Sequence, residues 1–234
     1  MNKPKAEIVD IFSSVQGEGI FLGARQIFVR FKRCNLACAF CDEPREHASR
    51  LYSPTELIEE IRSLEKGKSA HHSVSLTGGE PLLYTDFLKV FLPLLKKENL
   101  KSYLETNGTL PQELGEVIDL VDIVAMDIKL PSSTLERPFW ERHSEFLKVA
   151  SKKKVFVKAI VTPETTREDI VKTVEVVNSV GKHISLILQP ATPMKASDKA
   201  VPRDRLLEFM EIGIKNHLEN IRVIPQVHKL IGVK

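Results

Sequence analysis

The chain has 234 residues, with 34 Lys and Arg against 31 Asp and Glu, and a formal net charge of +3. This length allows one large domain with a substantial core, and the near balance of charge gives no indication of nucleic-acid or membrane binding. No apolar run is long enough to cross a bilayer, and the first residues, MNKPKAEIVDIF, lack the apolar core of a signal peptide. We therefore expect a globular, cytoplasmic protein.

Short β-branched runs alternate with amphipathic stretches along most of the chain. In chain order they predict a strand at 27–31, a helix at 52–65, a strand at 73–77, a helix at 86–99, a strand at 102–105, a helix at 111–118, a strand at 121–128, a mostly helical stretch at 133–150, a strand at 155–161, a helix at 166–180, a strand at 184–188, a helix at 202–220 and a last strand at 221–224. In the first helix, Ser53 is expected to be the N-cap, and Pro54 suits the first turn.

This alternation of strands and helices is typical of a parallel α/β sheet. About six βα units are too few for a closed eight-stranded barrel. The fold class we expect is therefore α/β, in the form of a partial, open TIM-like barrel of about six βα units.

Polar residues and glycines follow the predicted strands. They are Cys34 after the first, Gly78-Gly79-Glu80 after the second, Thr106-Asn107-Gly108 after the third, Asp127 and Lys129 after the fourth, and Gln189 after the sixth. Parallel sheets bind their ligands beyond the carboxyl ends of the strands. Five strand ends directed at one mouth predict a functional site there.

All three cysteines of the chain, Cys34, Cys38 and Cys41, form a C-x3-C-x2-C run. Thiolates hold iron–sulfur clusters, and a four-iron cluster usually takes four of them, so three would leave one iron open to a small molecule. The alternative is a zinc site with His47 as the nearest fourth ligand. A disulfide is disfavoured because the three cysteines crowd one short loop. The residues alone favour the cluster over zinc.

The cysteine spacing, with Phe40 before the third cysteine, resembles the radical S-adenosylmethionine (SAM) superfamily. There the open iron chelates SAM, and one electron from the cluster cleaves SAM to give a 5′-deoxyadenosyl radical. The Gly78-Gly79-Glu80-Pro81 run resembles the superfamily's element for the SAM amino group. The SAM contacts that the resemblance implies are Gly78, Gly79, Glu80, Glu105, Asp127, Lys129 and Gln189. A capping role for Glu105 and a structural Asp127–Lys129 ion pair remain open alternatives.

Further motifs resemble the 7-carboxy-7-deazaguanine synthase (QueE) family. They are Gln16-Gly17-Glu18-Gly19, Arg30, Asp42 directly after Cys41, and Pro225-Gln226-Val227-His228-Lys229. The resemblance implies a single radical SAM domain, residues 1–234, whose N-terminal and C-terminal segments complete the substrate pocket. The implied reaction converts 6-carboxy-5,6,7,8-tetrahydropterin to 7-carboxy-7-deazaguanine, with ring contraction and loss of ammonia, on the route to queuosine and other 7-deazapurines. The implied substrate contacts are Val15, Gln16, Gly17, Glu18, Arg30, Thr77, His228 and Lys234.

The implied cofactors are a [4Fe–4S] cluster on Cys34, Cys38 and Cys41, SAM, and Mg²⁺. Many members of the family bind Mg²⁺ through a Thr or Ser hydroxyl two residues after the third cysteine, where this chain has Glu43. A carboxylate suits Mg²⁺, so Glu43 is expected to bind it, unless it faces solvent or pairs with Arg33 or Arg45. The radical comes from the cofactor, so no side chain is expected to be catalytic.

The resemblance also implies partners: the small pterin substrate, an electron donor such as flavodoxin or ferredoxin, and a second copy of the chain in a homodimer. Neither nucleic acid nor membrane is expected as a partner. Two other functions remain open. A glycyl-radical activating enzyme shares the cysteine motif but needs an open mouth for a partner protein. A non-catalytic iron–sulfur or zinc module would bind no SAM.

Overall fold

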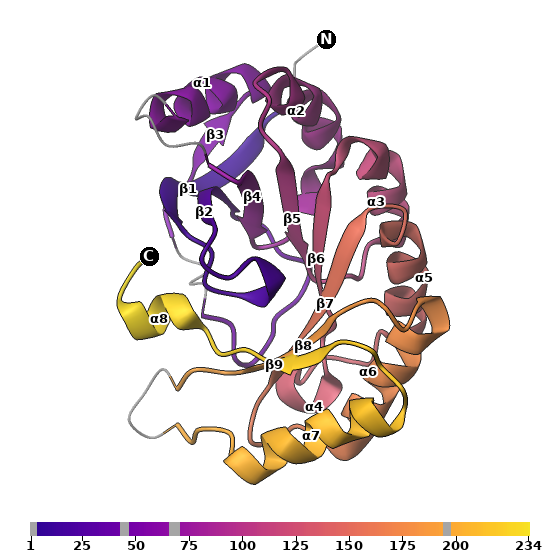
Figure 1. The fold of residues 1–234 in the computed structure, drawn as a ribbon. Coiled ribbons are helices and arrows are strands. Elements are labelled where there is room, and N and C mark those ends of the chain that lie inside the picture. The colour runs from indigo at the N-terminus through magenta and orange to yellow at the C-terminus, as the bar shows by residue number, and fades with distance from the viewer. Residues whose placement is uncertain (1–3, 43–46, 66–70, 194–197) are drawn as a thin grey trace.

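The computed structural model describes residues 4–42, 47–65, 71–193 and 198–234, which fold around one curved sheet (Figure 1). The strands in chain order are β1 (Ala6–Val15), β2 (Arg25–Phe31), β3 (Arg50–Tyr52), β4 (Ser73–Gly78), β5 (Ser102–Thr106), β6 (Ile123–Asp127), β7 (Lys154–Val161), β8 (Leu186–Pro190) and β9 (Ile221–Val223). Their order across the sheet is β3-β1-β2-β4-β5-β6-β7-β8-β9, so β3 and β9 are the two open edges. From β2 through β4 to β9 every pairing is parallel, whereas β1 is antiparallel to both of its neighbours. The predicted open α/β barrel is confirmed.

Helices cover the outer side of the sheet, as Figure 1 shows from α1 round to α7. Their bounds are α1 (Pro54–Glu65), α2 (Thr85–Lys97), α3 (Pro111–Val117), α4 (Pro131–Thr134), α5 (Trp140–Ala150), α6 (Arg167–Val180), α7 (Arg203–Lys215) and α8 (Val227–Ile231), with short 3-10 turns η1 (Gly19–Phe21), η2 (Pro81–Tyr84) and η3 (Ile118–Leu120). The predicted cap of α1 is confirmed. The Ser53 hydroxyl accepts from the Glu56 N–H at 3.3 Å, and the Glu56 carboxylate accepts from the Ser53 N–H at 2.8 Å, which is a capping box.

Several elements differ from the sequence prediction. The stretch 133–150 is two helices, because Leu135 takes a left-handed φ of 59° and ends α4. Helix α7 ends at Lys215 instead of 220, where His217 has a φ of 60° and Leu218 N–H bonds back to Gly213 O. Strands β1 and β3 and helix α8 were not predicted. Gln189 lies inside β8 instead of after it.

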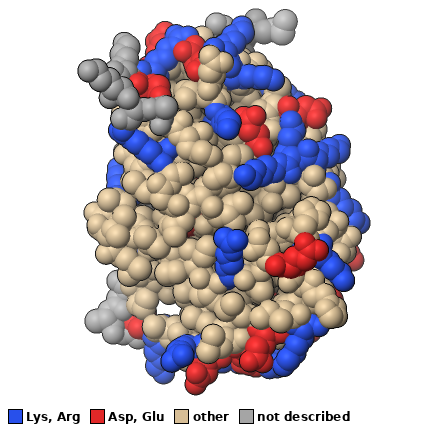
Figure 2. Space-filling model, viewed as in Figure 1, with Lys and Arg blue, Asp and Glu red and all other residues tan. Residues whose placement is uncertain are grey.

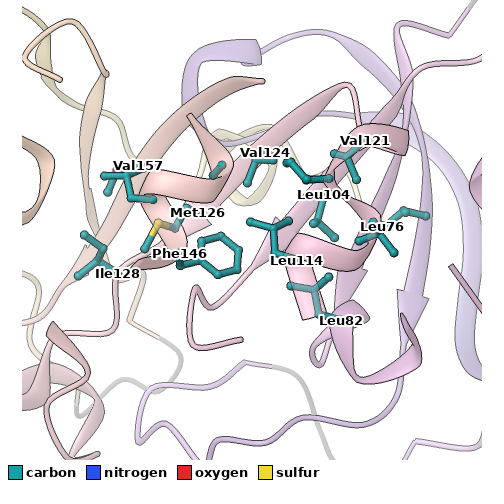
Figure 3. Packing of buried hydrophobic residues seen from close by; sticks show 14 of the residues in the cluster. Leu76, Leu82, Leu104, Leu114, Val121, Val124, Met126, Ile128, Phe146 and Val157 are labelled. Carbon is teal, nitrogen blue, oxygen red and sulfur yellow. The ribbon is translucent and has the colours of Figure 1, made fainter. Parts of the chain in front are cut away.

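The main core lies between the sheet and its helices. Figure 3 shows side chains from the strands, including Leu76, Leu104 and Met126, packed against Leu114 and Phe146 from the helices. All of these side chains are at most 1% exposed. Because side chains alternate along a strand, the residues between these core positions point to the inner side of the sheet, where the site forms.

A smaller apolar cluster fills the inner side of the sheet. It joins Tyr103, Ile123, Ala125, Phe156 and Ile187 from the strands to Ile20 and Phe21 from η1. The Phe21 ring meets the Tyr103 ring edge-on, with centroids 5.7 Å apart. The turn between β1 and β2 therefore plugs one end of the barrel, and this anchors the preceding Gln16-Gly17-Glu18 segment over the inner side.

Candidate active site

A cavity of about 250 Å³ lies among the carboxyl ends of the parallel strands. It is lined by most of the residues that the sequence marks: Val15, Gln16, Gly17, Glu18, Arg30, Cys34, Cys38, Cys41, Thr77, Gly78, Gly79, Glu105, Asp127, Lys129, His228 and Lys234. Two others, Glu80 and Gln189, do not line it, and Glu43 lies outside the described residues. The tertiary structure thus gathers into one cavity residues from both ends of the chain and from four strand ends.

The cysteine loop follows β2 and carries three cysteines, none of them in a disulfide. Its backbone is held by Cys41 N–H to Cys38 O at 3.1 Å and by Ala39 N–H to Thr134 O at 2.9 Å. Burial raises the pKa of Cys38 to about 11 and raises that of Cys34, so these two thiols are protonated near neutral pH when no metal is bound. Iron binding at this loop would release protons. Within the described residues, no group of three or more His, Cys, Asp or Glu is arranged to hold a metal ion.

The glycine pair after β4 brings backbone against the cysteine loop. A Cβ on Gly79 would lie 2.1 Å from Arg33 O, so only glycine allows this approach. The next residue, Glu80, is fully buried below the cavity, where its carboxylate accepts from Asn107 N–H, Leu82 N–H and the Thr106 hydroxyl. Burial raises the pKa of Glu80 to about 7. In this run, the backbone of Gly78 and Gly79 therefore faces the cavity, whereas Glu80 links β4 to the end of β5.

Polar side chains form a layer on the inner side of the sheet, next to the smaller apolar cluster that contains Phe21. Asp127 and Lys158 are direct neighbours on β6 and β7, and Lys129 donates to Asp127 at 2.9 Å. Lys158 is only 9% exposed, and its ammonium donates to Glu18. Burial is the largest single influence on the pKa of Glu18 and raises it, but the charge and hydrogen bond of Lys158, together with the hydrogen bond from Gln226, lower the pKa to about 2. Asp127 keeps one buried carboxylate oxygen without a hydrogen-bond partner, so it can accept from a ligand in the cavity.

The Gln16 side chain is occupied by the chain itself. Its amide donates to Gln26 at 3.0 Å and to Glu105 at 3.1 Å, and its oxygen accepts from Glu18 N–H at 3.0 Å. Ser75 also donates to Glu105, at 2.8 Å. Gln16 therefore fixes the shape of the segment before η1, and Glu105 is tied to this segment through Gln16.

The two ends of the chain meet beside the cavity. Val227 N–H donates to Gly17 O at 3.0 Å, and the Ser14 hydroxyl donates to Lys234 O at 2.6 Å. The Arg30 guanidinium lies 5.9 Å from the centroid of the Phe12 ring, and the Lys234 ammonium lies 4.6 Å from the same centroid. Two cationic side chains thus lie near one end of the cavity, and the Lys234 ammonium is also paired with Asp10.

The sequence prediction missed some residues that the structure places in the site. Lys158 is the clearest: the alternation Phe156, Lys158, Ile160 within a strand puts a charged side chain on the inner side, and this signal is present in the sequence. Gln226 also lines the cavity and donates to Glu18 at 2.9 Å. No local pattern indicates that contact, because it joins residues 208 positions apart.

A second cavity of about 610 Å³ adjoins the first and shares Phe40, Cys41, Asp42, Ile160 and Gln226 with it. Figure 2 shows the molecule hollowed at the lower left, on the side where Figure 1 places the segment after β8. The second cavity is lined partly by that segment, from Ala191 to Pro193. Together the two cavities offer room for more than one small molecule.

Comparison with known proteins identifies related sequences over the whole length. Residues 28–186 match the radical SAM superfamily. The chain is 39% identical to a 7-carboxy-7-deazaguanine synthase from Geobacter sulfurreducens, with 99% of each chain covered. It is 35% identical to one from Methanothermobacter thermautotrophicus, with 98% of each covered.

A solved structure shares the fold. The crystal structure of QueE from Escherichia coli superposes with a TM-score of 0.63 at 20% identity, covering 94% of this chain and 93% of that one. The fold that surrounds the cavity is therefore one that solved structures also contain.

Proposed function

We infer the reaction of this protein from its family, because the chain belongs to the radical SAM superfamily and, within it, to the 7-carboxy-7-deazaguanine synthases. It is a radical SAM enzyme that converts 6-carboxy-5,6,7,8-tetrahydropterin to 7-carboxy-7-deazaguanine with release of ammonia, in queuosine and 7-deazapurine biosynthesis. The observation that carries this function is the cavity where Arg30, Glu18 and His228 meet the cysteine loop. A glycyl-radical activating enzyme would need an open mouth, whereas here the segment around His228 lies against Gly17.

The chemistry of the residues present suits the expected cofactors. Three cysteines without a disulfide line the cavity, the chain has no fourth cysteine, and Asp127, which keeps an unpartnered oxygen, lines the same cavity. We propose that Cys34, Cys38 and Cys41 hold a [4Fe–4S] cluster, and that Gly78, Gly79, Asp127 and Lys129 contact SAM. When bound, the cluster and SAM supply the 5′-deoxyadenosyl radical that starts the reaction. Glu105 and Gln189 remain proposed SAM contacts, and Glu80 would support the glycine backbone from below.

The protein's own part is to bind and orient the pterin. Arg30 is proposed to bind the substrate carboxylate, because a guanidinium can donate to both oxygens at once. Glu18, kept ionised by Lys158, can accept from the N–H groups of the pterin ring. Val15, Gln16, Gly17, Thr77 and His228 would enclose the ring and exclude water, and the main chain of Lys234 would close the cationic end. Positioning of this kind is how a protein accelerates a reaction whose radical comes from a cofactor.

Mg²⁺ remains a proposal, since Glu43 lies outside the described residues. If its carboxylate binds Mg²⁺, Glu43→Gln should raise the Mg²⁺ concentration needed for half-maximal rate, because Gln keeps an oxygen but loses the charge. Excess Mg²⁺ should restore the rate. Full activity in EDTA, together with a Glu43→Gln variant that matches the parent at every Mg²⁺ concentration, would remove Glu43 from the site and leave the synthase function intact.

We also propose the setting in which the enzyme works: the cytoplasm, as a homodimer, with a one-electron donor such as flavodoxin or ferredoxin. Sedimentation of the purified protein tests the dimer. No helix among the described residues is long and apolar enough to span a membrane. Figure 2 shows Lys and Arg interspersed with Asp and Glu, mostly around the edges of one face. This mixture of charges agrees with the expectation that nucleic acid is not a partner.

The deciding experiment is an anaerobic assay of the reconstituted protein with SAM, a reductant and 6-carboxy-5,6,7,8-tetrahydropterin. We expect 7-carboxy-7-deazaguanine and ammonia in equal amounts, detected by mass spectrometry and a coupled ammonia assay. Cleavage of SAM without conversion of the pterin, combined with a glycyl radical formed on an added partner protein, would favour the activating enzyme instead.

A further inference from the structure

The polar residues of the segment Gln226-Val227-His228-Lys229 each contact a different part of the site. The Gln226 amide donates to Glu18 at 2.9 Å. His228 lies against Gly17, where an added Cβ would come within 2.1 Å of the imidazole Nδ1. Lys229 donates to Asp42 at 2.6 Å. One short segment therefore reaches both the substrate side of the cavity and the residue directly after the last cysteine.

This segment is held mainly by polar contacts. Helix α8 (Val227–Ile231) has no buried residue, and Leu230 and Ile231 are 71% and 58% exposed. A helix of five residues is not stable by itself, so its contacts with neighbouring elements decide whether it forms. Segments with few buried apolar contacts open at low free-energy cost. The C-terminal segment is thus well placed to open while the sheet stays intact.

The contact between Lys229 and Asp42 is the link to the cysteine loop. The two side chains are 29% and 42% exposed, so the ion pair is weak enough to break and re-form. Asp42 lines both cavities, and Lys229 lines the second. Opening this pair would therefore widen the passage between them.

We propose that residues 226–234 form a clasp, in which Gln226 and Lys229 are positioning residues that join the segment Gln16-Gly17-Glu18, the substrate segment, to the cysteine loop. The clasp opens to admit the pterin and closes when Lys229 meets Asp42. Closure fixes the cysteine loop only when the substrate segment is in place, so a bound pterin promotes productive use of SAM. This role rests on the proposed function, but the opening of the clasp can be measured without turnover.

The first test is hydrogen–deuterium exchange of the reconstituted holoprotein without pterin. The amides of Val227 and Val233 donate to Gly17 O and His228 O, so they report on closure of the clasp. Lys229→Met should raise the exchange rate of these two amides about two- to fivefold, which is the range for loss of a partly exposed ion pair. Exchange in peptides from 34–42 should rise as well. The matched control is Lys215→Met, which breaks a similar exposed pair with Glu211 on α7. Exchange equal to that of the control in both regions would overturn the clasp.

The second test measures coupling during turnover. Lys229→Met should raise both the KM for the pterin and the ratio of 5′-deoxyadenosine to product about two- to fivefold. The affinity for SAM in the absence of pterin should not change. Lys229→Arg, which keeps the charge, should restore the KM and the ratio. Asp42→Asn combined with Lys229→Met should be no worse than either change alone, because the two residues act as a pair. Multiplicative losses, or an unchanged ratio, would contradict the proposal. If the wild type forms no product from this pterin, the proposed function fails, while the exchange result still decides the clasp.

Discussion

Arg30 is the last charged residue of β2, and its position illustrates what a single side chain decides here. It lines the cavity beside Phe12, at the end that also holds the Lys234 ammonium. A guanidinium there can bind a carboxylate with two parallel hydrogen bonds, which a lysine cannot do.

We predict that Arg30→Lys weakens pterin binding by about 1.5–3 kcal/mol, the contribution of a charge-assisted hydrogen bond, and leaves SAM binding and folding intact. Titration calorimetry of the anaerobic protein with each ligand measures the two affinities. An unchanged pterin affinity would show that Arg30 does not bind the substrate.

The Glu18–Lys158 pair shows the cost of a charged residue inside the barrel. Both side chains are largely buried, at 16% and 11% exposure, and each compensates the other. The pKa of Glu18 is about 2 in the folded state against an ordinary value of 4.5. The pair therefore stabilises the fold fully above pH 4.5, and this contribution is lost as the pH falls towards 2.

We predict that Lys158→Met lowers the free energy of unfolding by about 3–5 kcal/mol at pH 7, because it leaves a buried carboxylate without its cation. The difference between wild type and variant should shrink as the pH falls from 4.5 towards 2, where Glu18 takes up a proton. Urea unfolding of the cluster-free wild type and variant at several pH values across this range measures this difference in the free energy of unfolding. The double change Glu18→Gln with Lys158→Met should recover part of the loss; no recovery would mean that another partner of Lys158 dominates.

At the scale of elements, the connection from β1 to β2 does two things at once. Its η1 turn plugs the barrel through Phe21, and the residues before the turn face the cavity. Gly17 is the point where this connection meets the C-terminal segment, since Gly17 O accepts from Val227 N–H and a Cβ would strike His228. The two ends of the chain can approach this closely only because residue 17 has no side chain.

We predict that Gly17→Ala reduces pterin turnover about 10–100-fold by displacing His228, while the cluster and SAM affinity are retained. Steady-state kinetics with varied pterin, together with SAM titration, separates the two effects. Gly115→Ala is the control: Gly115 lies in α3 with nothing within 4 Å of an added Cβ, so that change should raise stability by about 0.5–1 kcal/mol without altering kinetics. Turnover by Gly17→Ala at the control's rate would show that His228 does not need this position.

At the scale of the whole molecule, the open sheet collects ligands at one mouth. All three cysteines of the chain lie in one loop at that mouth, so the molecule has no further thiol to complete a cluster. An incomplete set of ligands leaves one iron for SAM.

We predict that anaerobic reconstitution gives about four irons and four sulfides per chain, and that Cys38→Ala loses both the cluster and SAM cleavage. Iron and sulfide analysis and electron paramagnetic resonance of the reduced protein provide the measurement. Stoichiometric zinc and no iron in protein purified without oxygen would contradict the cluster.

Local patterns in the sequence indicated the parallel part of the sheet and the class of chemistry. The parallel strands from β2 to β9 were all predicted, because short apolar runs bounded by helices are a local signal. The Cys34-x3-Cys38-x2-Cys41 run and the glycine pair at the end of β4 are equally local, and their resemblance to the radical SAM superfamily indicated radical chemistry. Strand β1 was missed because it is antiparallel, bulged near Ile8 and Asp10, and mostly half-buried, so its pattern is weak.

Only the tertiary structure decided how the two ends of the chain complete the site. The contacts of Glu18 with Lys158 and Gln226, and of Asp42 with Lys229, join residues 140 to 208 positions apart. Local propensity and periodicity report on neighbours along the chain and carry no signal for such pairs. The barrel is open, so its inner side accepts the turn between β1 and β2, and the C-terminal segment lies against the residues before that turn. Glu18, Lys158 and Gln226 are largely buried there and must find partners among themselves, whereas the Asp42–Lys229 pair forms nearer the surface.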